Sequence, residues 1–159
     1  MNNWNQLADD ARVWLYGANR ALTESEESQI LLMLDRFCDE WAAHGAKLNC
    51  GFQILHHQII VLGVDEASAA ASGCSIDSSV KVFRDIDAQF QLDLFNRLRS
   101  YHIIGNTISA IDSTHVKAKV DTEQVKADSG FIDMLIATKG EVNNALIKPM
   151  SQTWLSKYL

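Results

Sequence analysis

The chain has 159 residues, of which 47% are hydrophobic and 21% charged, enough to bury the core of one domain. Its formal net charge of −6 disfavours a nucleic-acid partner, because surfaces that bind nucleic acid are basic. No apolar stretch approaches the roughly 20 residues of a membrane span, and the N-terminal residues lack the pattern of a signal peptide. We therefore expect a single domain over residues 1–159 with no nucleic-acid or membrane partner.

The cysteines bear on the compartment and on metal binding. Cys38, Cys50 and Cys74 are spaced 12 and 24 residues apart. An odd count without a Cys-x-x-Cys pair argues against a disulfide framework and against a structural zinc site. We expect a cytoplasmic protein with free thiols, no metal and no cofactor.

The first elements in chain order are a helical turn within residues 3–10, a strand at 13–16 and a long helix. Thr23 and Glu26 form a capping box that begins the helix. The helix should end near His44-Gly45, with the glycine as a left-handed cap. Its apolar stripe consists of Ile30, Leu34, Phe37 and Trp41.

A β-hairpin and a second long helix follow. Residues 48–54 alternate between apolar and polar, and residues 59–64 form a continuous apolar run, which predicts a hairpin whose second strand is central and buried. The apolar positions of the second helix are Ile76, Val80, Phe83, Ile86 and Phe90.

The remaining segments mix short strands and helices. They predict strands at 92–95 and 101–111, a helix at 113–127, a strand at 131–137, and a helix that begins with a capping box at Thr138 and ends near Ile147. Gly105-Asn106 predicts a turn. An amphipathic tail with Trp154, Leu155 and Tyr158 packs into the core or serves a homodimer. The fold class is α+β: a mainly antiparallel sheet with two long amphipathic helices packed on it.

The candidate site is the strand–loop–helix junction at residues 65–79. Loops of this kind often carry function, and amides at a helix start can bind an anionic group. The first hypothesis is therefore a domain that binds a small molecule or a protein partner. Its expected ligand-binding residues are Glu66, Ser72, Gly73, Ser75, Asp77, Ser78 and Arg97, the last supplying positive charge. The alternative is that the same polar groups only cap the loop and the helix.

The second hypothesis is a cysteine-dependent enzyme. A helix N-terminus lowers the pKa of a thiol, so Cys74 would be the nucleophile, His44 its base and Asp65 or Glu66 the orienting carboxylate. Asp77 opposes this because its negative charge lies in the same helical turn. The structural alternative is a small cysteine that fills a tight loop.

Several of these residues also carry a family resemblance. They are Trp14-Leu-Tyr16 with Arg20, Phe37-x-x-x-Trp41-x-x-His44-Gly45, Val64-Asp65-Glu66, Ser72–Ser79, and Phe95-x-Arg97. The chain resembles, over most of its length, an uncharacterised bacterial family whose members are often labelled "ABC transporter ATPase". That label implies a phosphate-binding Gly-x-x-x-x-Gly-Lys-Ser/Thr loop. The sequence contains no Gly-Lys dipeptide, which argues against ATP hydrolysis.

Overall fold

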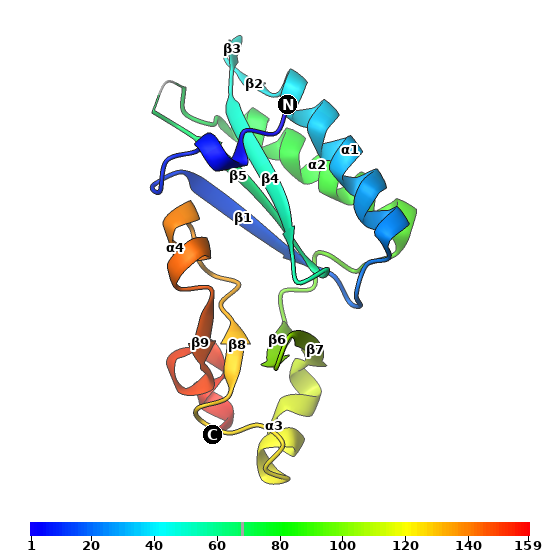
Figure 1. Cartoon of the computed structure of the whole chain (residues 1–159), viewed down its shortest axis with the longest axis vertical. Coiled ribbons are helices and arrows are strands. Elements are labelled where there is room, and N and C mark those ends of the chain that lie inside the picture. The colour runs from blue at the N-terminus through cyan, green and yellow to red at the C-terminus, as the bar shows by residue number, and fades with distance from the viewer. Residues whose placement is uncertain (68) are drawn as a thin grey trace.

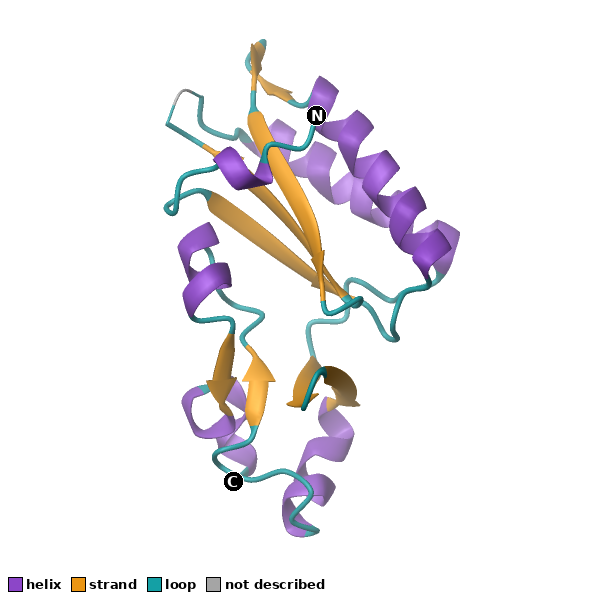
Figure 2. Cartoon of the chain, viewed as in Figure 1, coloured by secondary structure: helices purple, strands orange, loops and turns teal. Residues whose placement is uncertain are grey.

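The described part of the chain folds into two larger antiparallel sheets, each accompanied by helices, and a short two-stranded sheet within residues 42–47 (Figures 1 and 2). The structure is a computed structural model that describes residues 1–67 and 69–159. The first sheet has the order β1-β5-β4, with β1 (Arg12–Gly17), β4 (Asn49–Leu55), β5 (Ile59–Asp65), and the helices α1 (Glu24–Glu40) and α2 (Gly73–Phe90). The expected α+β class, antiparallel pairing and two long packed helices are confirmed.

The C-terminal part builds the second sheet. Its order is β7-β6-β8-β9, with β6 (Arg99–Ile104), β7 (Thr107–Asp112), β8 (Gly130–Ile132) and β9 (Ile147–Pro149). The other elements are η1 (Trp4–Gln6), β2 (Ala42–Ala43), β3 (Ala46–Lys47), α3 (Ser113–Asp121), α4 (Lys139–Asn144), η2 (Met150–Gln152) and η3 (Trp154–Tyr158). Within residues 1–67 and 69–159, no helix combines the length and apolar character needed to cross a bilayer.

Both faces of the first sheet are buried, because alternate side chains on a strand point to opposite faces. Figure 1 shows α1 and α2 side by side on one face. Tyr16 of β1 and Leu62 of β5 pack under these helices. Leu15 and Val61, one position earlier on each strand, pack on the other face with Tyr101 of β6. The continuous apolar run 59–64 is thus explained by a central strand between two cores, as predicted.

Helix α1 begins as predicted and ends earlier than predicted. The Thr23 hydroxyl accepts from the Glu26 amide at 3.1 Å, and the Glu26 carboxylate accepts from the Thr23 amide at 2.9 Å. The helix stops at Glu40, because the Trp41 indole donates to the Ser75 carbonyl at 2.8 Å and the chain then turns away. The expected end at His44-Gly45 is wrong: these two residues form the turn between β2 and β3.

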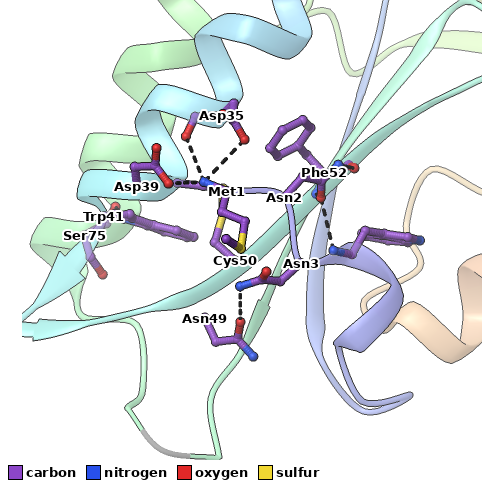
Figure 3. The surroundings of a disulfide bond; sticks show 12 residues. Met1, Asn2, Asn3, Asp35, Asp39, Trp41, Asn49, Cys50, Phe52 and Ser75 are labelled. Carbon is purple, nitrogen blue, oxygen red and sulfur yellow. Dashed lines mark hydrogen bonds and ion pairs between the residues drawn. A yellow bond between two sulfur atoms is a disulfide. The ribbon is translucent and has the colours of Figure 1, made fainter.

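Two of the three cysteines form a disulfide, so the expectation of free thiols is wrong for this pair. Cys38 of α1 and Cys50 of β4 lie with their Cα atoms 5.6 Å apart and are both buried. The bond joins a helix to the sheet beneath it, a proximity that packing creates and spacing along the chain does not reveal. Figure 3 shows Met1 beside this disulfide, with its ammonium paired to Asp35 and Asp39 of α1.

Both edges of the first sheet are covered. At β4, the Asn3 amide donates to the Cys50 carbonyl at 3.1 Å, and the side chain of Asn2 bonds the backbone of Phe52 (Figure 3). Gly51 permits this close approach, since a Cβ there would lie 2.4 Å from the Trp4 nitrogen. At β1, the Val13 amide donates to the Ala137 carbonyl at 2.9 Å.

The predicted strand at 92–95 is wrong. Leu92 and Leu94 are buried, which explains the alternation, but positive φ angles at Gln91 and Asp93 make the segment a turn. The Leu94 amide is held by the Asp87 carboxylate of α2 at 3.0 Å instead of by a neighbouring strand. Buried residues therefore alternate with exposed ones in this segment although it does not pair with a neighbouring strand.

The later predictions are correct in type and too long in extent. The turn at Gly105-Asn106 joins β6 to β7 as expected. The helix predicted at 113–127 ends at Asp121, and the strand predicted at 131–137 is only Gly130–Ile132. Thr138 caps α4 by accepting from the Glu141 amide at 3.3 Å, and this helix ends at Asn144. The tail packs on its own chain through Leu155.

Candidate functional site

Most of the polar side chains of the junction at 65–79 form hydrogen bonds with the junction's own backbone. The Asp65 carboxylate accepts from the Ala67 amide at 2.9 Å, and the Glu66 carboxylate accepts from the Ala71 amide at 3.1 Å. Glu66 also lies 3.8 Å from the Arg12 guanidinium. Residue 68 of this segment lies outside the described residues. The acidic pair therefore shapes the loop, as the capping alternative holds.

The serines of the junction cap α2. The Ser72 hydroxyl accepts from the Ser75 amide at 3.2 Å, and the Ser75 hydroxyl donates back to the Ser72 carbonyl at 2.8 Å. Ser78 donates to the Cys74 carbonyl at 3.1 Å. Gly73 and Asp77 are exposed in the first turns of the helix. The side chain of Ser72 thus caps the helix by bonding the Ser75 amide, one of the amides that an anion at this position would use.

The cysteine hypothesis places its residues on separate elements. Cys74 is exposed in the first turn of α2, and His44 is exposed in the turn between β2 and β3. Among the described residues no hydrogen bond joins Cys74, His44 and Asp65 to one another. A triad is therefore not assembled in this structure.

Arg97 lies away from the junction. Its Nη1 donates to the Leu15 carbonyl at 3.1 Å, and its guanidinium stands 5.2 Å from the centre of the Tyr16 ring. The junction meets the opposite end of β1, where Arg12 pairs with Val64. The structure therefore separates Arg97 from the other expected ligand-binding residues.

Arg97 instead borders a pocket of about 190 Å³ where the two sheets meet. We call this the arginine pocket. Its polar residues are Asn96, Arg97, Arg99 and Tyr101, and its other residues are Gly17, Leu94, Met134, Leu135 and Trp154. They come from the end of β1, the turn before β6, β6 itself, the segment after β8, and η3. No single stretch of sequence contains this set.

Tyr101 is the unusual group in the arginine pocket. Tyr101 is only 1% exposed, and its phenolic oxygen makes no hydrogen bond of ordinary geometry in the described part of the chain, although the Arg99 guanidinium lies close enough to interact with it. A Cβ on Gly17 would lie 2.0 Å from this oxygen, so the bare glycine makes room for the phenol. A buried polar group without a partner costs free energy, about 1–3 kcal/mol, and the packing around Gly17 must offset that cost.

The guanidinium groups set the electrostatics of the pocket. Arg99 is only 9% exposed and donates to the Asp93 carboxylate at 2.5 Å and to the Asp93 carbonyl at 3.1 Å. Burial raises the pKa of the Tyr101 phenol, and the neighbouring Arg99 opposes that rise. The phenol is thus neutral at pH 7 and lies beside the fixed positive charge of Arg99.

One sequence pattern relates to this pocket. Arg97, Arg99 and Tyr101 follow one another at a spacing of two, which is typical of one face of a strand. The strand β6 begins only at Arg99, and Arg97 lies in the turn before it. The groups that complete the pocket, Gly17 and Trp154, carry no local signal.

A broader groove of about 480 Å³ lies between α1 and α2. The junction borders it through Ser78, with Phe37 and Val82 among its apolar residues. Its charges include Lys81, which pairs with Asp85 at 3.0 Å. The arginine pocket is the stronger candidate, because two guanidinium groups held by the protein border it.

Comparison of the chain with protein-family models, with curated proteins and with solved structures gave no match to any of them.

Proposed function

We propose that this protein is a binding domain for a small anionic molecule, which occupies the arginine pocket. The observation that carries the proposal is the pair of guanidinium groups, Arg97 and Arg99, which border one concave pocket and are held by hydrogen bonds to the protein. Arginine is the side chain best suited to hold a carboxylate or phosphate, since its N–H groups match the spacing of two oxygens. The proposal keeps the small-ligand function expected from the sequence and moves its site from residues 65–79 to Arg97 and its neighbours.

The position of the pocket supports this role. It lies where elements from both halves of the chain converge, and ligand sites favour such concave places with a few fixed polar groups among apolar walls. Arg97 is held by the Leu15 carbonyl and Arg99 by Asp93, so neither charge needs to be ordered when a ligand arrives. A preorganised site loses less entropy on binding.

The experiment is an NMR titration of the full chain in low-salt buffer with acetate, inorganic phosphate and benzoate, added separately. We expect at least one of these anions to shift the amide signals of Gly17 and Tyr101 and the Trp154 indole signal. Arg97→Gln should weaken that response. Arg84→Gln is the matched control, because Arg84 stacks on Phe95 at 4.6 Å outside the pocket lining. If no anion shifts these signals, or if both variants respond alike, the proposal fails.

The cysteine-dependent enzyme is the second candidate, and the exposure of Cys74 is the observation that favours it. On that reading the folded protein should react with iodoacetamide at pH 7 faster than the same thiol in the urea-unfolded chain. A rate equal to or below that of the unfolded chain would remove the candidate. Cys38 and Cys50 do not interfere, since they are paired.

We infer a cytoplasmic location from the sequence, and the disulfide makes the inference testable. Thiols of cytoplasmic proteins are usually kept reduced, but Cys38 and Cys50 are buried and thus shielded from small reductants. Alkylation of freshly lysed cells followed by intact-mass measurement counts the free thiols. Three free thiols in the cell would mean that the bond forms only after lysis, and one free thiol would mean that it exists in the cell.

A further inference from the structure

In the described part of the chain, three of the four edges of the two larger sheets are closed to a further strand. The edges of β4 and β1 bond the N-terminal segment and Ala137, respectively. The edge strand β9 has only 3 residues and includes Lys148 and Pro149, a charge and a proline of the kind that discourages strand addition. The fourth edge is β7, whose 6 residues contain no proline and no charge before Asp112.

The backbone groups that β7 directs outward are those of Ile108 and Ala110. Ile104 and Thr107 flank the tight turn between β6 and β7, so they exchange hydrogen bonds with each other. Bonded and non-bonded pairs alternate along an antiparallel ladder, which turns the amides and carbonyls of Ile108 and Ala110 away from β6. Within residues 1–67 and 69–159, no group outside β6 forms a hydrogen bond with them.

The side chains at this edge are also incompletely covered. Ile108 and Ala110 pack at the margin of the core between the two sheets, and both are only half-buried. Ile103, which pairs with Ile108, and Leu55 of β4 share that margin and are half-buried too. A strand added to β7 would therefore bond open backbone groups and remove apolar surface from water at the same place.

The sequence of β7 is complementary to a second copy of itself. In an antiparallel pairing about a twofold axis at Ser109, Ile108 lies opposite Ala110 of the second copy, so a large side chain meets a small one. Asp112 is the only charged residue of the strand, and in this register it lies opposite Asn106, so no like charges meet. The twofold axis also closes the edges of both copies in one contact, which an unrelated extended peptide would not do.

We propose that this protein forms a homodimer in which the β7 strands of two copies pair antiparallel about Ser109. Ile108 of each copy exchanges backbone hydrogen bonds with Ala110 of the other, and the second sheets of the two copies become one continuous sheet. The C-terminal tail is not needed for this contact, since its Leu155 packs within its own chain. The interface also contains none of the residues that border the arginine pocket, so it is independent of the proposed anion binding.

The first test is analytical ultracentrifugation of the full chain over a wide range of micromolar concentrations. We expect a reversible monomer–dimer equilibrium. Ala110→Pro should raise its dissociation constant about tenfold or more, because it removes an outward amide from each copy and none that β6 uses. Leu32→Ser is the control, since it removes exposed apolar surface on α1. A chain that stays monomeric, or a dimer that Ala110→Pro does not weaken, would overturn the proposal.

A cysteine variant tests the register and does not depend on the folding of the proline variant. Ser109 would lie opposite its own copy in a non-hydrogen-bonded pair, with Cα atoms about 4.5 Å apart, a distance that a disulfide can bridge. In a Cys74→Ser background, which removes the exposed thiol, air oxidation with copper phenanthroline should link the copies of Ser109→Cys.

Asn106→Cys in the same background is the matched control. The proposed register places the two copies of residue 106 roughly 20 Å apart, so their thiols should not link. Non-reducing gels and intact-mass measurement report the covalent dimer. Failure of Ser109→Cys to link, or linking of Asn106→Cys at the same rate, would show that β7 does not pair in this way.

Discussion

The two larger sheets of this protein differ in how fully their faces are buried and their polar groups are hydrogen-bonded. The first sheet has both faces buried and both edges covered, and the loop that leads into α2 satisfies its polar groups internally. The second sheet has shorter strands, exposes Ile104 and Ile147, and leaves the Tyr101 phenol without a partner where it meets the first. The difference indicates that the first sheet is the more completely packed part, whereas the boundary between the sheets contains the pocket that we propose as the site.

The largest expected effect tests whether the two parts unfold together. Phe83, stacked on Tyr16 at 3.8 Å, and Phe131, stacked on His102 at 5.0 Å, are both fully buried, one in each part. Replacing either by alanine should cost about 4 kcal/mol, and because a shared core joins the sheets, each variant should unfold in one transition. Denaturant unfolding followed by far-ultraviolet circular dichroism and by tryptophan fluorescence measures this. Two separated transitions in Phe131→Ala would show that the second sheet is an independent unit.

Reduction of the disulfide should have the next largest effect on stability, and the bond lies entirely within the part of the chain that forms the first sheet and its helices. Reduction should lower the free energy of unfolding by about 3 kcal/mol, because the closed loop that joins Cys38 to Cys50 restricts the unfolded chain. Guanidinium unfolding with and without a phosphine reductant measures the change. Cys74→Ser is the control and should leave the difference unaltered, since Cys74 is exposed and free. Equal stability in both conditions would contradict a structural role for the bond.

Gly17→Ala breaks the contact between the sheets at the pocket. The added Cβ would meet the Tyr101 phenol at 2.0 Å, so we expect a loss of about 1–3 kcal/mol together with loss of anion binding. Thermal unfolding and the benzoate titration report the two effects. Gly73→Ala is the matched control, because nothing lies within 4 Å of a Cβ there. A Gly17→Ala protein with unchanged stability and binding would show that the phenol moves aside freely.

The smallest expected effect concerns the cap of α1. Hydrogen bonds from Arg20 and from the Thr23 amide lower the pKa of Glu26 to about 2. The stabilisation is therefore present above the ordinary value near 4.5 and is lost as the pH falls toward 2. Glu26→Gln should cost about 0.5–1 kcal/mol at pH 7, since solvent around the exposed Arg20 screens the pair, and nothing near pH 2. Urea unfolding midpoints at pH 7 and pH 2 measure this cost, with Glu24→Gln as the control. An equal cost at the two pH values would show that the ionised Glu26 carboxylate does not stabilise the cap.

Local patterns predicted the elements that local chemistry controls. The capping boxes placed the start of α1 and the cap of α4, and the apolar run at 59–64 identified the central strand. The predictions were wrong where contacts between residues far apart in the sequence determine the local structure. Trp41 leaves α1 because its indole bonds the Ser75 carbonyl of α2, and Leu92 and Leu94 alternate in burial because they close a core.

The sequence by itself determined the α+β class, the antiparallel hairpins and the two long helices. It also identified Arg97 as a candidate binding residue. Periodicity and caps act over a few residues, so they can be read directly from the chain. Only the tertiary structure decided that Cys38 pairs with Cys50, that the junction at 65–79 caps itself, and that Arg97 meets Tyr101 over Gly17. Those results depend on which surfaces pack together, and segments far apart in the chain come into contact only when both cores have formed.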